Sequence, residues 1–195
     1  TPEMLGEEEV DIRKYAAEVG SAIATGASPI GEAAAVGAEL DITVSDMGLG
    51  VDYVETFVVV MDGTHGIILI EKAAYEDYDP ATDEYAFPNP YGWCDDGSSP
   101  WNRTEDIITG AQLTYLLSEF DSNIYPTNTE IFGEPLGRGD EGQKVWILIH
   151  NIRGDSYYDM ENYTSYIAGY FSASEDAENN KNMMHIDSYD WEQYC

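Results

Sequence analysis

The three histidines of the chain are the side chains best suited to metal or acid–base chemistry, and their spacing limits what they can do. His65, His150 and His185 lie far apart in sequence, and none has another histidine four residues away. An HExxH zinc helix needs two histidines one turn apart, with a glutamate between them that activates water. The chain is therefore expected to contain no catalytic zinc site, and no catalytic residue is assigned.

His185 is followed by Ile186 and Asp187 in a run that is predicted to form a strand. Residues i and i+2 of a strand point to the same face, so His185 and Asp187 could share a metal ion. The alternative is a structural histidine that is held by hydrogen bonds. A Ser-His-Asp hydrolase is disfavoured, because no serine carries the glycine pattern of a nucleophile elbow.

Two pairs of aspartates form carboxylate clusters in predicted loops. Asp77 and Asp79 belong to the first pair, and Asp95 and Asp96 to the second. Oxygen-rich loops suit Ca²⁺, so these four residues are the candidate calcium ligands. The alternative is that they are solvated loop residues with no ligand.

Charge is the outlier in the composition. Asp and Glu number 38 against 8 Lys and Arg, which gives a formal net charge of −30, while hydrophobic residues make up an ordinary 43%. Such a surface repels nucleic acid and anionic membranes, and it suits a salty or extracellular medium. The longest apolar runs have strand length, far short of the roughly 18 residues that span a bilayer, so no membrane span is expected.

The cysteines and two sequons fit an exported protein. Cys94 and Cys195 are an even pair, which predicts a disulfide, with two free thiols as the alternative. Asn102 and Asn162 each begin an Asn-x-Thr acceptor sequence for N-glycosylation.

The first 75 residues are predicted to form a helix packed on a small antiparallel sheet. Apolar residues recur with a helical period over Glu7–Thr25, whereas Leu40–Val44 alternates like a half-buried strand. Two apolar runs, Tyr53–Met61 and Gly66–Glu71, flank a glycine-containing turn and predict a hairpin.

The remainder is predicted to form a linker followed by a second region. Residues 76–103 are rich in Pro, Tyr and Asp and are expected to form a loop. Residues 104–195 are expected to start with a helix capped near Thr104 and ending near Phe120. Strands are then expected at Lys144–Ile152, Tyr166–Phe171 and Met183–Asp187. The predicted fold class is α/β in the α+β sense: a small antiparallel sheet with an N-terminal helix, then a helix and a mixed sheet.

Five phrases in the last third suggest a family. They are FDSNIYP (Phe120–Pro126), IFGEP (Ile131–Pro135), KVWILIHNIRG (Lys144–Gly154), YIAGYFS (Tyr166–Ser172) and NMMHIDSYDW (Asn182–Trp191). In this order the chain resembles the N-terminal half of the catalytic domain of secreted zinc metallopeptidases of the hyicolysin-like and immune-inhibitor-A-like groups. The resemblance implies a zincin-like upper lobe, in which the HExxH helix follows the segment matching IDSYDW and packs on the sheet. Here the chain ends at Cys195 before such a helix.

Two functions are consistent with these observations. The first is an extracellular metallopeptidase-like protein, represented by a portion without its zinc motif and inactive as this chain. The alternative is a non-catalytic extracellular structural subunit of a filament or surface assembly. Either protein is expected to need a partner, which would be another copy of the chain or the missing C-terminal half, because the sheet would otherwise leave an open edge or apolar face.

Overall fold

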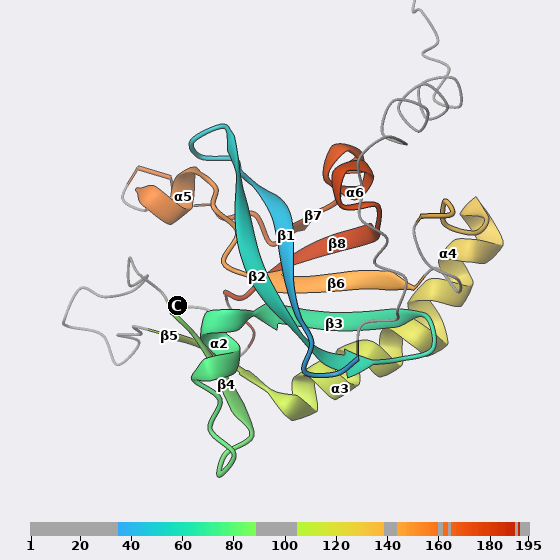
Figure 1. The fold of residues 1–195 in the computed structure, drawn as a ribbon, viewed down its shortest axis with the longest axis horizontal. Helices are drawn as coiled ribbons and strands as arrows, with labels where there is room; N and C mark the ends of the chain where they lie inside the picture. The colour runs from blue at the N-terminus through green and yellow to red at the C-terminus, as the bar shows by residue number, and fades with distance from the viewer. Residues whose placement is uncertain are drawn as a thin grey trace, which may run out of the picture. The chain divides into compact units, whose positions relative to one another are not determined.

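The described part of the chain folds around one curled, mixed β-sheet. The computed structural model describes residues 35–88, 105–138, 144–159, 162–163, 165–189 and 191. Its sheet has the strand order β1-β2-β3-β6-β8-β7 (Figure 1). The strands are β1 (Glu39–Asp46), β2 (Val51–Asp62), β3 (Gly66–Glu71), β6 (Val145–His150), β8 (Asn182–Asp187) and the short β7 (Gly169–Tyr170). Together with the helices this makes an α+β fold, as the sequence predicts.

The predicted hairpin is confirmed, and it belongs to the same sheet as the later strands. β1, β2 and β3 run antiparallel, β3, β6 and β8 run parallel, and β7 is antiparallel to β8. The sequence suggested a small antiparallel sheet and a separate mixed one. The pairing of Ile67–Ile70 with Trp146–Ile149 joins them instead, because both central strands are apolar on both faces. The sheet thus spans both regions that the sequence analysis separated.

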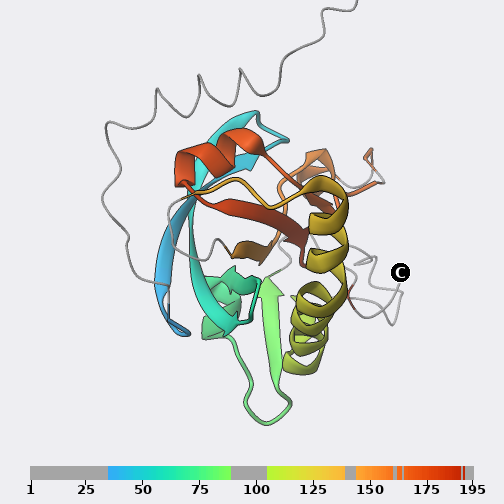
Figure 2. The ribbon, with the colours of Figure 1, turned by 90° about the vertical axis from the view of Figure 1, so that its right-hand side faces the viewer.

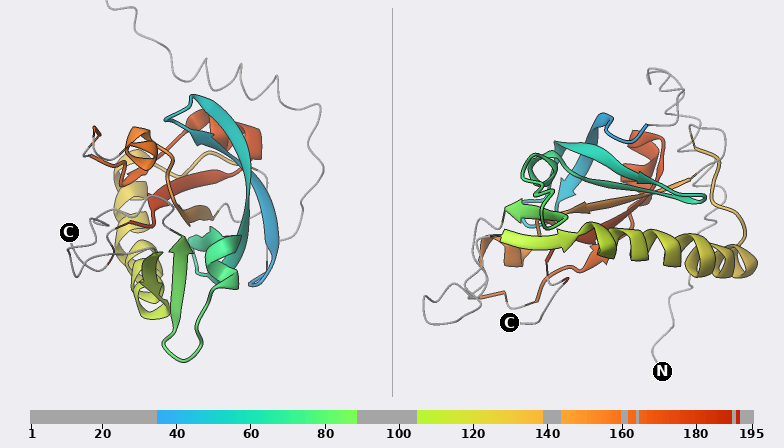
Figure 3. Two further views of the ribbon diagram at one scale, coloured as in Figure 1. Left: turned by 90° about the vertical axis from the view of Figure 1, so that its left-hand side faces the viewer. Right: turned by 90° about the horizontal axis from the view of Figure 1, so that it is seen from below.

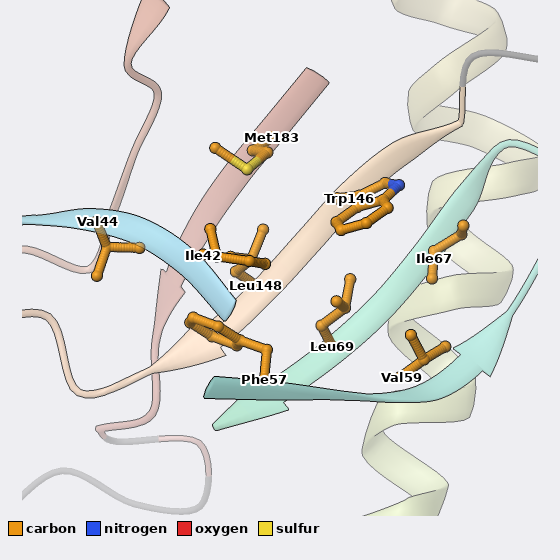
Figure 4. Close-up of a cluster of buried hydrophobic side chains, with 9 residues drawn as sticks. All are labelled: Ile42, Val44, Phe57, Val59, Ile67, Leu69, Trp146, Leu148 and Met183. Carbon is orange, nitrogen blue, oxygen red and sulfur yellow. The ribbon is translucent and has the colours of Figure 1, made fainter. Parts of the chain in front are cut away.

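One face of the sheet curls around a hydrophobic core. The alternation predicted in β1 is correct, since Ile42 and Val44 are buried while Asp41 is exposed. Ile42 and Val44 belong to the same cluster as residues of β6 and β8, although β3 and β2 lie between them in the sheet (Figure 4). The cluster comprises Ile42, Val44, Phe57, Val59, Ile67, Leu69, Trp146, Leu148 and Met183.

A helical layer covers the opposite face. α3 (Gly110–Glu119), a π-helical turn η1 (Phe120–Ile124) and α4 (Tyr125–Phe132) form one continuous rod along the sheet (Figures 2 and 3). Leu113 and Phe120 pack with Ile68, Ile70 and Ile147 in a second core cluster. α4 extends beyond this cluster and has no buried residue.

The predicted linker and helix start need correction. Residues 76–103 were expected to form a loop, yet β4 (Glu84–Pro88) lies in this range and pairs with β5 (Glu105–Thr109). The proline rule still holds, because Pro88 is the last residue of a two-stranded ribbon. The helix expected from Thr104 begins at Gly110 instead. Thr109 and Gln112 form a reciprocal capping box there, and this fixes the start of α3.

The remaining differences concern one strand and several short helices. Pro126 lies in the first turn of α4, where its missing N–H costs nothing. The strand expected at Tyr166–Phe171 is only two residues long in β7. Three short helices were not predicted: α2 (Lys72–Glu76), α5 (Asp155–Tyr158) and α6 (Ala173–Asn179). The helix predicted over Glu7–Thr25 lies outside the described residues.

Candidate functional site

Polar side chains gather where the three parallel strands end. Glu71, His150 and Asp187 are the last residues of β3, β6 and β8, and the strand register places them in one row. By alternation they share the face of the curled core. The carboxyl ends of parallel strands are a preferred place for sites in sheets of this kind, so the row and its neighbours form the candidate site.

Two histidines in this site are bonded to each other. His150 Nε2 lies 3.1 Å from His185 Nδ1, and His185 Nε2 lies 3.3 Å from Glu175 Oε2. Tyr170 stacks on the His185 ring at 4.2 Å and donates its hydroxyl hydrogen to Glu175 Oε2 at 3.0 Å. We call His150, His185, Glu175 and Tyr170 the histidine cluster.

The hydrogen-bond chain favours one arrangement of protons. Glu175 Oε2 accepts from the Tyr170 hydroxyl and, as an acceptor for His185 Nε2 too, leaves the hydrogen on that nitrogen and His185 Nδ1 as an acceptor. His150 Nε2–H then donates to His185 Nδ1. The remaining ring nitrogen, His150 Nδ1, is buried and has no hydrogen-bond partner among the described residues.

Burial keeps both imidazoles neutral. It lowers the pKa of His150 to about 3, with further contributions from His185 and from the Arg153 guanidinium. It also lowers the pKa of His185 to about 4. Both shifts follow from the cost of placing a charge where water cannot solvate it.

The pKa values of the two carboxyl groups in the row, Glu71 and Asp187, shift upward, because burial again disfavours the charged form. Burial, and then the nearby Glu55 carboxylate, raise the pKa of Glu71 to about 8. Burial also raises the pKa of Asp187 to about 6, although its oxygens accept from the backbone N–H of Ile152 and Tyr189. At neutral pH Glu71 therefore holds a proton that an exposed carboxyl would have lost, whereas Asp187 takes one up only in mildly acidic solution.

One cation borders the site. The Arg153 guanidinium lies 3.8 Å above the Tyr53 ring and 3.5 Å from Glu55 Oε2. A cation stacked on an aromatic face and paired with a carboxylate neutralises part of the local charge. It stands beside half-buried Tyr53 and Glu55, at the border of the site with solvent.

The histidine cluster is closed to substrates in this conformation. His150, His185 and Glu175 are each at most 3% exposed. A shallow hollow of about 440 Å³ lies elsewhere, beside Met61, Leu117 and Asp121 on the helical face. The arrangement of the cluster therefore suits packing and a fixed hydrogen-bond network, and a reacting molecule could reach it only after a movement of the chain.

The sequence-predicted residues fall in different places. His185 and Asp187 do share a face, but His185 bonds to Glu175 and His150, while Asp187 accepts from backbone N–H groups. This geometry matches the structural alternative. Glu71, Tyr170 and Glu175 were not predicted. The one signal for Glu175 was Ser172-Ala173-Ser174-Glu175, a helix-start pattern in which Ser172 Oγ accepts from the Glu175 N–H.

The calcium and modification residues remain predictions. Asp77 and Asp79 are exposed in the turn between α2 and β4, and Asp79 Oδ1 accepts from the Ala81 N–H. Among the described residues, no three His, Asp or Glu side chains converge in a metal-binding arrangement. Asn162 is exposed, and its side chain donates to Asp159 Oδ2. Asp95, Asp96, Cys94, Cys195 and Asn102 lie outside the described residues.

No known family model matches the chain, and no curated protein matches it significantly. Within the described ranges, none of the helices has both the length and the apolarity needed to cross a membrane.

Proposed function

We propose that this chain is the sheet-bearing portion of an extracellular metallopeptidase-like protein and that these 195 residues do not themselves hydrolyse peptides. The observation that carries the proposal is the element order. The helical rod of α3, η1 and α4 is followed by β6, β7 and β8, with the short helices α5 and α6 between the strands. Apart from these short helices, this is the helix–strand–strand–strand order that the resemblance implies for a zincin-like upper lobe. The pairings add a parallel core with one antiparallel edge strand.

The packing of β8 gives further support. Met184 and Ile186 face the helical layer and are only partly buried, whereas Ile147 and Ile149 of the neighbouring strand are fully buried. A further helix packed beside α3 would cover these two side chains. In the peptidases that the chain resembles, the zinc helix packs on the sheet after the segment matching IDSYDW.

The histidine geometry agrees with an inactive chain. Two of the three imidazoles are bonded to each other inside the sheet, and the third, His65, stacks on Tyr125 at 4.1 Å. None is therefore free to pair with another as an HExxH helix requires. The high negative charge, the cysteine pair and the sequons support the extracellular setting.

Two measurements test the proposal. Native protein from its source should have an intact mass well above 21.6 kDa, and the gene should encode an HExxH motif beyond Cys195. The recombinant chain, dialysed after exposure to zinc, should retain far less than one zinc per molecule and should not cleave casein. Stoichiometric zinc with hydrolysis, or a native mass near that of this chain, would overturn the proposal.

A second candidate, an extracellular structural subunit, is favoured by the tip of α4. Ile131, Phe132 and Leu136 are 66%, 82% and 59% exposed, an unusual concentration of apolar side chains on so acidic a chain. If these residues mediate assembly, Phe132→Glu should dissociate the oligomers that light scattering detects. Tyr115→Glu, a change at a 69% exposed aromatic on α3, is the control and should leave them intact. A monomeric native chain would reject this candidate.

A further inference from the structure

The open edge of β1 is closed by side chains from the other end of the sheet. Asn179, the last residue of α6, donates to the Thr43 carbonyl at 2.9 Å and accepts from the Thr43 N–H at 3.0 Å. Burial raises the pKa of the Tyr170 hydroxyl, and the backbone N–H of Ser45 faces that hydroxyl closely enough to offset a small part of the rise. These contacts occupy backbone groups that an edge strand would otherwise offer to another strand.

The same short helix is attached to the histidine cluster. Glu175, one turn before Asn179, is buried and bonds to His185 and Tyr170. Asn179 also donates to the Glu175 carbonyl at 2.9 Å. A change in the protonation of the histidines would therefore act, through Glu175, on Asn179, which closes the β1 edge.

We propose that the histidine cluster is an acid-sensitive lock, which holds α6 and Tyr170 against β1 at neutral pH and releases the β1 edge when both histidines take up protons. The lock rests on the arrangement of hydrogens. One hydrogen is shared between His150 Nε2 and His185 Nδ1. Two imidazolium rings would place two N–H groups against each other at that 3.1 Å contact.

The surroundings oppose the second proton, because burial and nearby positive charge outweigh the smaller favourable contribution of the Asn151 backbone to the pKa of His150. Phe57 packs edge-on against His150, and Arg153 adds positive charge. By register, Glu71 of β3 and Asp187 of β8 flank His150. Burial raises the pKa of Glu71 to about 8, so Glu71 is neutral at acidic pH, and raises that of Asp187 to about 6, so Asp187 becomes neutral once the pH falls below that value. On the side of α6 and β7, Glu175 and Tyr170 already bond to His185.

The peripheral element is the one that moves. His150 and His185 lie in central strands, whereas α6 is a seven-residue helix that contacts the sheet through Glu175, Asp176 and Ala177. Release of α6 would expose the N–H groups of Thr43 and Ser45 to solvent or to a pairing strand. In the folded state the pKa values of His150 and His185 both lie below the ordinary 6.5. The attachment of α6 to the sheet should therefore weaken as pH falls from 6.5 towards 4.

Amide hydrogen exchange on the full chain tests the lock directly. After correction for intrinsic rates, protection at Thr43 and Ser45 should fall by up to about a hundredfold per pH unit in this window, because two protons are linked to opening. Amides of Ile68 and Leu148 in the central strands should keep their protection. Unchanged protection at Thr43 and Ser45, or loss at the same pH as in the central strands, would overturn the lock.

Three variants make the test specific. His150→Gln keeps an N–H donor for His185 but cannot take up a proton. In this variant the protection of the Thr43 and Ser45 amides should therefore fall by only about tenfold per pH unit. His65→Gln, far from the cluster on the β2–β3 turn, is the matched control and should behave as wild type. Asn179→Ala should abolish protection at Thr43 even at neutral pH. A His65→Gln effect as large as that of His150→Gln would also overturn the proposal.

Discussion

At position 110 an added Cβ would collide with the carboxylate of Asp83 unless that side chain moved. A Cβ on Gly110 would lie 2.5 Å from Oδ1 and 2.7 Å from Cγ of Asp83. Asp83 has a positive φ of 60° and bonds to the Tyr78 hydroxyl, so its carboxylate is held in place. The negative charge lies at the N-terminus of α3, where the helix dipole favours an anion.

Gly110→Ala should therefore destabilise the protein, although alanine favours helices by about 1 kcal/mol over glycine. The clash should cost about 1–3 kcal/mol, as overpacking usually does. Chemical denaturation of the variant measures this loss. Gly154→Ala is the control, because its Cβ would meet only the flexible end of Ile167 at 3.2 Å. A more stable Gly110→Ala would show that Asp83 moves away freely.

Among the elements, the rod of α3 and η1 is fastened to the β2–β3 turn by one carboxylate. Asp121 accepts three backbone N–H groups, from Thr64 at 2.6 Å, His65 at 2.8 Å and Gly66 at 3.0 Å. Successive N–H groups of this kind form an anion-binding concavity, which Asp121 fills from within the chain. The π-helical turn that begins at Phe120 places Asp121 opposite the turn.

Asp121→Ala should lower the free energy of unfolding by about 2–4 kcal/mol, because three donors lose a charged acceptor. Urea titration at neutral pH measures the effect. Glu119→Ala removes a nearby half-buried carboxylate that accepts from the Asn123 side chain, and it should change stability by less than about 0.5 kcal/mol. Equal effects of the two changes would contradict this role for Asp121.

Elements with a strong local pattern were predictable from the sequence. The alternation of β1, the β2–β3 hairpin and the apolar runs of β6 and β8 all appear where they were expected. The start of α3 was missed because two capping sequences compete, Thr104-Glu105-Asp106 and Thr109-Gly110-Ala111-Gln112. The pairing of β5 with β4 decides in favour of the second. Short helices such as α6 carry too few residues for a periodicity.

The candidate site was harder to predict than the strands that carry it. His150 and His185 lie 35 residues apart, and their contact depends on the parallel register of β6 with β8. Glu175 reaches His185 only because α6 packs back onto the sheet. The sequence indicated that His185 could be a structural residue, but pairing partners set by register are not visible in one sequence.

At the scale of the whole molecule, buried ionisable groups make stability depend on pH. The pKa of Glu71 is raised from 4.5 to about 8, so the folded state holds this proton more tightly than the unfolded state. Its stabilising contribution is complete below pH 4.5 and is lost as pH rises through 8. The lowered pKa values of His150 and His185 act in the opposite sense, since they cost stability as pH falls below 6.5.

Glu71→Gln should remove the alkaline loss, because glutamine cannot ionise. Between pH 5 and pH 9 the free energy of unfolding of the variant should increase, relative to that of the wild type, by on the order of 3 kcal/mol. Thermal unfolding across this range measures the difference. Glu119→Gln, at a half-buried position of α3, should show no such gain. A wild-type melting temperature that stays level from pH 5 to pH 9, with no change in the variant, would contradict burial of an ionisable Glu71.

The net charge of −30 makes the molecule depend on its counterions as well. Repulsion among surface carboxylates favours expansion, and salt screens it over about 10 Å at 0.1 M. Raising NaCl from about 10 mM to about 500 mM should therefore increase the melting temperature by about 5 °C. If the predicted calcium ligands bind, CaCl₂ at equal ionic strength should increase it further, and a chelator should reverse only that extra part. Equal curves in both salts would exclude specific calcium binding, because screening alone depends on ionic strength and not on which cation supplies it.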